Sequence, residues 1–321
     1  MTSSTPAPTT VIPTDAIVVG VGPDGSESAL RFAVEEARRA GRPVHLLHVL
    51  QLPSSEAYAG LYGEALEGAR ETLARTVRQA ARVAGRDVAV TSELVPLGRV
   101  VDELVKHTDG NQLMVLEHRA LGRLQRMVGG SVVQSVAGRA RVPVVSVPAG
   151  WAPRQEEPKV VTAAVQDALE APVVLHAAFE EARKLGGAVV VLHAWWLASG
   201  FEAETVDQTM REEWAERTRA ELHPVLAPFR SAFPDVEVAV DVRHAPPTEA
   251  VLDAAEVSDL VVIGRRHHLL PLRTHLGPVA RAVLGHATTP VLITPESPVT
   301  VKSERRAQRA NRYLETLAPI D

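Results

Sequence analysis

Cysteine is absent from the 321 residues, so the chain has neither disulfides nor thiolate chemistry. Aromatic residues make up only 4%, and the net charge of −5 comes from interspersed acidic and basic residues. Few rings are therefore available for base stacking, and no positive field attracts phosphodiester backbones. No apolar run approaches the roughly 20 residues that a membrane-spanning helix needs. These absences exclude nucleic acid and membrane as expected partners.

The start of the chain also lacks the pattern of a secretory signal. Residues 1–14 are rich in Ser, Thr and Pro, without a basic start or an apolar core, and are expected to be a disordered tail. A composition of 45% hydrophobic and 23% charged residues is that of a globular protein. We therefore predict a soluble, cytoplasmic protein.

What the sequence does contain is a long internal repeat. The segment Leu46–Val49 returns as Val191–Ala194 at an offset of 145 residues, and Val142–Val145 returns as Thr289–Leu292 at an offset of 147. This period is far longer than that of a solenoid unit, so each copy is large enough to be a domain with its own core. Function must therefore be sought in each copy, and the two copies compared.

Within each copy, apolar β-branched runs alternate with segments whose apolar residues recur at helical spacing. The runs predict strands at residues 15–21, 44–50, 88–95, 113–116 and 144–147, and again at 160–164, 188–194, 236–242, 260–263 and 291–294. Because helices that connect parallel strands cover both faces of the sheet, the pattern predicts two doubly wound α/β domains.

The predicted organisation has five parts. After the tail at 1–14 come a first α/β domain at 15–148, a linker at 149–158, a second α/β domain at 159–295 and a charged C-terminal tail at 296–321. In such folds a ligand binds beyond the carboxyl ends of the strands, where the strand order reverses. The loops after the first and fourth strands of each copy are therefore the candidate sites.

The chain resembles the universal stress protein family in its tandem, two-domain form. The resemblance covers Asp15 to Pro295, and its marks are the first-strand start Ile17–Val21, the Leu-His and His-Ala-Trp strand ends and the Val-Pro-Val-Val close. It implies a five-stranded parallel sheet of order 3-2-1-4-5 in each domain. It also implies that the fifth strands pair, so that the chain forms an intramolecular pseudo-dimer, and that two chains associate as a homodimer.

ATP-binding members of that family carry an Asp after the first strand and a loop of pattern Gly-x2-Gly-x9-Gly-Ser/Thr after the fourth. The resemblance implies ATP as the ligand and nucleotide-binding residues at the positions that match this motif. These candidates are Asp24, Gly130, Ser131, Gly264 and Gly277. Asp24 takes the Asp position only if Gly22-Pro23 is an insertion, and the alternative alignment puts Gly22 there. No metal is expected.

Both copies depart from the motif. In the first, Glu117 and Ala120 replace the opening glycines, and a carboxylate at Glu117 would repel phosphate. In the second, Val165 stands at the Asp position, and the closing pair ends in Pro278, which has no amide hydrogen to offer an anion. Neither copy keeps a complete site, so nucleotide binding is expected to be weakened or lost.

Three functions remain open. The first is a regulatory protein of the stress-response class that acts through an unidentified protein partner, with degenerate nucleotide sites. The alternative is an adenine-nucleotide sensor or slow ATPase. The third is a small-molecule binder, which would need an apolar cavity at the switch point. No general base with a partner stands out, so turnover of a substrate is not expected.

Three side-chain groups invite a sharper interpretation. Adjacent His267 and His268 lack a carboxylate or cysteine to complete a metal site. His48 and His193 occupy matching places at the ends of second strands, which favours a shared packing or hydrogen-bonding role over catalysis. The pair Trp195-Trp196 is expected at the edge of the core, or as a dock for a partner.

Overall fold

The computed structural model describes residues 14–51, 61–118, 132–166, 171–196, 207–265 and 276–295. Its contacts divide the chain into two compact units, a first unit of Met1–Gln155 with Leu284–Leu292 and a second unit of Glu156–Val283 with Ile293–Asp321. Helix α9 (Pro278–His286) and strand β10 (Val291–Thr294) each contain residues of both units.

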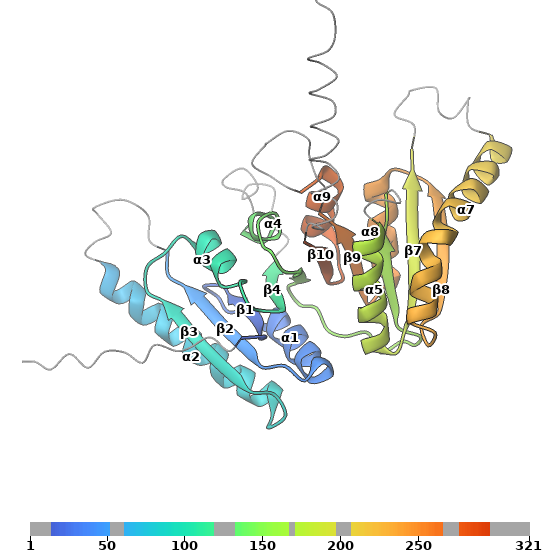
Figure 1. Cartoon of the computed structure of the whole chain (residues 1–321). Coiled ribbons are helices and arrows are strands. Elements are labelled where there is room, and N and C mark those ends of the chain that lie inside the picture. Colours follow the sequence, from blue (N-terminus) through green and yellow to red (C-terminus); the bar gives the residue numbers. More distant parts are fainter. Residues whose placement is uncertain are drawn as a thin grey trace, which may run out of the picture. The chain divides into compact units, whose positions relative to one another are not determined.

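The first unit is a parallel sheet with the strand order β3-β2-β1-β4-β5. Helices α1 and α2 pack on one face of this sheet and α3 and α4 on the other (Figure 1). The order confirms the 3-2-1-4-5 arrangement that the resemblance implies. The elements are β1 (Ile17–Val21), α1 (Glu27–Ala40), β2 (Val44–Val49), α2 (Tyr62–Ala84), β3 (Val90–Val95), α3 (Val100–Lys106), β4 (Leu113–His118), α4 (Val132–Ala137) and β5 (Val144–Pro148).

Central strands such as β1 form where the sequence is apolar and rich in β-branched residues, because both faces of a parallel sheet are covered by helices. All five residues of β1 and all six of β2 are buried. Helix α1 buries the stripe that includes Leu30, Ala33 and Ala37, and it ends at Gly41, whose φ of 64° lies in the left-handed region that suits glycine.

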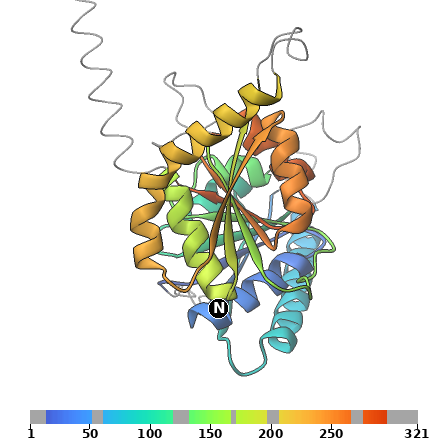
Figure 2. The ribbon, with the colours of Figure 1, turned by 90° about the vertical axis from the view of Figure 1, so that its right-hand side faces the viewer.

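The second unit repeats this design. Its strands run in the order β9-β6-β7-β8, with α5 and α7 on one face and α8 on the other (Figure 2). The elements are β6 (Val160–Ala164), α5 (Ala171–Leu185), β7 (Ala188–Trp195), α7 (Gln208–Ala232), β8 (Val238–His244), α8 (Pro247–Val257) and β9 (Leu260–Gly264). The pseudo-dimer formed by pairing of the fifth strands stays a prediction.

Three strands, β1, β3 and β8, begin two residues later than the sequence suggests, and β8 shows a physical reason. The apolar run predicts a strand from Val236, but β8 begins at Val238, because the Val236 amide donates to the Phe233 carbonyl at 3.1 Å and closes a turn. Val236 is nevertheless buried, so its side chain serves the core from the turn. Burial, rather than strand pairing, explains why an apolar residue stands there.

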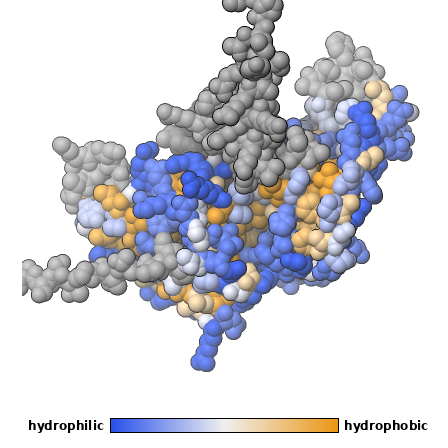
Figure 3. All heavy atoms as spheres, viewed as in Figure 1, coloured by the Kyte–Doolittle hydropathy of each residue, from blue (hydrophilic) through white to orange (hydrophobic). Residues whose placement is uncertain are grey.

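The outer helix surfaces are polar, as expected for helices that bury one stripe. Hydrophilic residues cover much of the face seen in Figure 3. Among the residues that the structure describes, no helix is both long and apolar enough to cross a membrane.

Two of the buried histidines of the first unit, His45 and His118, have lowered pKa values. The His45 side chain on β2 is completely buried, with Nδ1 2.8 Å from the Thr91 hydroxyl and Nε2 3.8 Å from the Glu93 carboxylate. Burial lowers the pKa of His45; nearby Glu93 opposes this effect, and His107 adds to it. Burial also lowers the pKa of His118, which lies 2.8 Å from the Ser146 hydroxyl through Nδ1.

These shifts predict how stability depends on pH. In the unfolded chain both histidines have the ordinary pKa of 6.5. Below that pH, the unfolded state therefore binds more protons than the folded state. Their contribution is therefore fully present above 6.5 and is lost as the pH falls towards the lower folded pKa values. Urea unfolding at about pH 7.5 and about pH 5.5 should show a lower midpoint at the acid pH.

The His45→Gln variant serves as the control for this dependence, because it removes one titrating group and keeps a polar side chain. The midpoint difference between the two pH values should be smaller in the variant than in the unaltered protein. An equal difference in both proteins would contradict the assignment to His45.

Candidate functional site

The candidate site of the first unit begins with the loop between β1 and α1. The Gly25 amide donates to the Gly22 carbonyl at 3.0 Å, which closes a β-turn with Pro23 and Asp24 at its two central positions. Proline suits the first of these because its ring fixes φ near −65°. Asp24, a predicted nucleotide-binding residue, is exposed on this turn.

Helix α1 is not capped by the residue at its N-cap position. The Ser26 side chain makes no capping hydrogen bond to the helix; its hydroxyl accepts from the Gly22 amide at 3.1 Å, within the loop. Glu117 of β4 takes over the capping role. One of its carboxylate oxygens accepts from the Ser28 amide at 2.8 Å and from the Ala29 amide at 3.4 Å.

A carboxylate therefore occupies the place where this fold would present free amides to an anionic ligand. Helix N-termini attract negative charge because their first amides lack partners within the helix and the helix dipole is positive there. The Ser28 hydroxyl adds a second closing contact, because it accepts from the Gly150 amide at 2.9 Å. The chain itself supplies the anion at the N-terminus of α1.

The second unit has a glycine at the position of Glu117. Leu116 of β4 pairs with Gly20 of β1, and Ile263 of β9 pairs with Ala164 of β6, so the next residues, Glu117 and Gly264, occupy equivalent positions. Without a side chain at Gly264, nothing from this position reaches towards α5. A cavity of about 380 Å³ lies here instead, with Gly264 in its lining.

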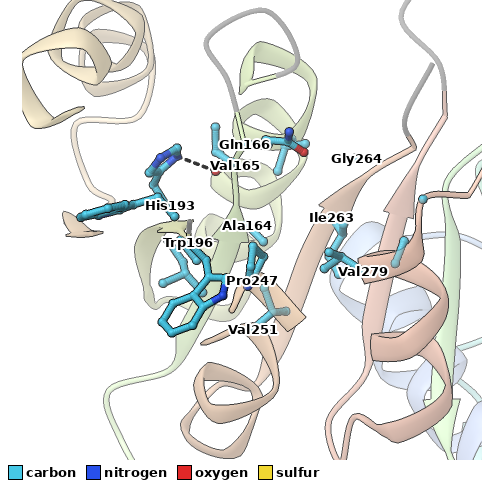
Figure 4. A pocket seen from close by; sticks show the side chains of 16 residues that line it. Ala164, Val165, Gln166, His193, Trp196, Pro247, Val251, Ile263, Gly264 and Val279 are labelled. Atoms are coloured by element: carbon cyan, nitrogen blue, oxygen red, sulfur yellow. Dashed lines mark hydrogen bonds between the residues drawn. The ribbon is translucent and has the colours of Figure 1, made fainter. Parts of the chain in front are cut away.

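The walls of this pocket are mainly apolar. It lies at the carboxyl ends of β6, β7 and β9, where ligands bind in doubly wound folds, and its volume is within the range of small-molecule sites. In Figure 4, Trp196, Pro247 and Val251 lie on one side, facing Ile263 and Val279 on the other. The residues found to line it include no Asp, Glu, Lys or Arg.

Aromatic rings form one wall of the pocket and continue beyond it. Trp195 and Trp196 both line the cavity, and both rest on His244, with ring centroids 4.3 and 5.2 Å from it. Trp195 also stacks on Trp214 of α7 at 4.9 Å, and the Arg217 guanidinium lies 4.2 Å above the Trp214 ring. The predicted position of Trp195 and Trp196 at the edge of the core is therefore also the wall of a pocket.

Matching histidines brace the ends of the strands in both units. Nδ1 of His48 lies 2.8 Å from the Val21 carbonyl, and Nδ1 of His193 lies 3.1 Å from the Val165 carbonyl. A carbonyl oxygen only accepts, so each Nδ1 carries the proton and donates it. These bonds confirm the shared hydrogen-bonding role inferred from the repeat. Of the two, His193 also lines the pocket.

The structure brings together two of the five predicted nucleotide-binding residues. Gly264 ends β9, Gly277 immediately precedes α9, and both line the pocket. Gly130 and Ser131 lie outside the described residues, as do His267 and His268. Among the residues that are described, no group of three His, Asp or Glu is placed to hold a metal ion.

The described residues of the pocket fit a triphosphate poorly. Helix α9 begins at Pro278, which lacks the amide hydrogen that the first residue of a helix would offer to an anion. At the position of the expected Asp, Val165 is buried and presents an apolar side chain. The features that hold nucleotide phosphates and the nucleoside in the ATP-binding pattern are therefore altered here.

Sequence reasoning missed the capping role of Glu117 and the place of Trp196 in the pocket. The sequence did contain a signal for the role of Glu117. At the repeat offset of 147, this carboxylate residue matches Gly264, which has no side chain. No comparable signal existed for the tryptophans, since residues Trp195 and Trp196 match Leu50 and Gln51 in the first copy.

These features define a tandem doubly wound α/β protein in which Gly264 of the second unit borders a pocket, whereas Glu117, at the equivalent position of the first unit, accepts hydrogen bonds from the start of a helix. The model of the universal stress protein family matches residues 13–148 and 158–295, so the chain belongs to that family. A universal stress protein of Mycolicibacterium smegmatis is 30% identical over 284 residues, which cover 86% of this chain and 96% of that protein.

Two further comparisons agree. A universal stress protein of Mycobacterium tuberculosis is 27% identical over 294 residues, covering 88% of this chain and 97% of the relative. The crystal structure of a universal stress protein from Archaeoglobus fulgidus superposes with a TM-score of 0.61 and 17% identity, covering 89% of this chain and 98% of that one. The last likeness shows the fold alone.

Proposed function

We propose that the protein is a regulatory binding protein of the universal stress class that holds one small ligand per chain, in its second unit, and signals occupancy to a protein partner. The observation that carries the proposal is the 380 Å³ cavity at the carboxyl ends of β6, β7 and β9. This is the condition that the small-molecule hypothesis set from the sequence. Partner association, a homodimer and a cytoplasmic location stay predictions.

The difference between the two units supports a single site. Glu117 satisfies the Ser28 and Ala29 amides in the first unit, whereas Gly264 leaves the equivalent position of the second unit without a side chain. An unequal pair of sites suits a regulatory protein, because one half is free to respond to a ligand while the other keeps a fixed shape. The Glu117 contacts are internal and need no ligand.

An adenine-nucleotide sensor is the second candidate. It is favoured by Gly264 and Gly277, which match glycines of the ATP-binding pattern and both line the pocket. Under this alternative, Mg-ATP binds the second unit at least as tightly as its nucleoside does. The small-ligand binding protein proposed above does not need phosphate on its ligand.

The first test fills the pocket from α9. Val279 is only partly buried and lines the cavity, so Val279→Trp should place an indole ring in the cavity and leave the core intact. Adenosine and riboflavin serve as probes, because both carry flat rings of suitable size. We expect binding of the better probe to weaken at least about 30-fold in the variant, measured by calorimetry.

The matched control is Val132→Trp. Val132 precedes Val279 by the repeat offset of 147, lies at the start of α4 and is 41% exposed. This variant should bind the probe as the unaltered protein does. Equal affinities in all three proteins would show that the pocket is not the binding site, and so would equal losses in both variants.

A further inference from the structure

We propose that the pocket of the second unit selects a flat, uncharged aromatic ring, which stacks on Trp196, and that it discriminates against the phosphate esters of the same molecule. This inference rests on the proposed function and specifies the chemistry of that site. Three properties of the pocket carry it: the lack of Asp, Glu, Lys and Arg among the described residues of its lining, an aromatic platform and an acceptor nitrogen.

The first property is electrostatic. None of the residues found to line the cavity is Asp, Glu, Lys or Arg. An ionised group that moves from water into a cavity without a partner of opposite charge loses much of its hydration energy. Contacts with apolar walls compensate little of this loss. Pro278 removes one further amide donor where α9 meets the pocket. The described lining therefore favours a neutral ligand.

The second property is the platform. Trp196 is 46% exposed although it lines the cavity, and its ring is nearly parallel to that of His244, at 29° and 5.2 Å. His244 also contacts Trp195, at 4.3 Å and a tilt of 48°, and Trp195 is stacked on Trp214. The Trp196 indole is thus held against a cluster of rings. A rigid aromatic surface at a pocket wall binds flat rings through offset stacking.

The third property is an imidazole nitrogen that can accept a hydrogen bond. The Nδ1–H of His193 is committed to the Val165 carbonyl at 3.1 Å, so in the neutral imidazole Nε2 is the acceptor. His193 and the Gln166 amide are polar side chains in a lining that is otherwise mainly apolar, and Figure 4 shows both beside β6. A ring that carries an N–H or amino donor matches this arrangement.

The test uses calorimetry on the full chain with adenosine, AMP, Mg-ATP and riboflavin. Adenosine and its phosphates share one ring and differ in charge, so their order of affinity isolates the effect of phosphate. We expect adenosine to bind at least about tenfold more tightly than AMP or Mg-ATP. Phosphate esters that bind as tightly as adenosine would overturn the inference.

Two variants test the platform. Trp196→Ala should weaken adenosine binding about 10- to 100-fold, the loss measured when an aromatic ring stacked on a base is removed. Trp196→Phe keeps a flat ring and should bind within about threefold of the unaltered protein. A purely structural defect at this position would weaken adenosine binding in both variants alike. The thermal unfolding midpoint of each variant shows whether its fold is intact.

The outcomes separate this inference from the proposal on which it rests. If Val279→Trp abolishes binding while Trp196→Ala leaves it unchanged, the pocket is real and the stacking inference is wrong. If neither variant affects binding, both the pocket and the inference fail. If neither adenosine nor riboflavin binds at millimolar concentration, both proposals are likewise overturned.

Discussion

The Gly264→Glu variant is expected to lose binding in the second unit by at least about 100-fold, which corresponds to about 2.7 kcal/mol. Gly264 lines the cavity at the position that Glu117 occupies in the first unit. A carboxylate introduced there should reach the first turn of α5, as Glu117 reaches that of α1. The new side chain would fill the cavity and bring a negative charge into an apolar lining.

The Gly264→Ala variant is the control for this substitution. It adds a single methyl group at the same position and should lower adenosine affinity by less than about threefold, because the cavity is large compared with a methyl group. Calorimetric titration of the three proteins with adenosine measures the difference. A Gly264→Glu variant that binds normally would show that this position does not control access to the pocket.

Glu117→Ala is expected to destabilise the first unit by about 2–4 kcal/mol. The change removes the acceptor for the Ser28 and Ala29 amides and the negative charge at the N-terminus of α1. Unsatisfied amides cost about 1–3 kcal/mol each, and a favourable charge at a partly buried helix end adds up to about 2 kcal/mol. The longer hydrogen bond, to the Ala29 amide at 3.4 Å, is the weaker of the two. The expected destabilisation is therefore smaller than the sum of the largest values for both amides and the charge.

Hydrogen exchange localises this effect. The Ser28 and Ala29 amides should exchange faster in Glu117→Ala, while amides of the second unit keep their protection. Glu117→Gln keeps an acceptor oxygen without the charge, so it should lose less than half as much stability as Glu117→Ala in urea unfolding. Unchanged exchange at Ser28 would refute the capping role.

The fold follows from the sequence for physical reasons that act locally. The run Ile17–Val21 is β-branched at every position except Gly20, and only a strand covered on both faces buries all of these side chains. The helix stripe of α1 and the turn at Gly41 are likewise readable from spacing and residue type. The ends of strands are less certain, as Val236 shows, because turns also bury apolar residues.

The site was harder to predict, because its contacts join residues far apart in the chain. Glu117 caps a helix that begins 90 residues earlier, at Glu27. A capping residue is normally sought next to the helix, but the side chain of Ser26, which stands at the N-cap position of α1, makes no capping hydrogen bond. Similarly, the ring contacts of Trp195 and Trp196 need Trp214 and His244, which come from two other elements.

The glycines of the second copy, in contrast, were located from the sequence. Gly264 and Gly277 were singled out by resemblance to a phosphate-binding pattern, and both do line the pocket. Their chemical surroundings, however, are apolar side chains such as Val251 and Ile263 together with two tryptophans. A motif thus locates the site, while the ligand it suits depends on the side chains that surround it.

The most direct test of the account is the number of ligands that one chain binds. Calorimetric titration of the full chain with adenosine should give one site per chain, and that site should disappear in Gly264→Glu and persist in Val132→Trp. Two equivalent sites per chain, or one site that survives Gly264→Glu, would contradict the claim that Glu117 closes the first unit and Gly264 opens the second.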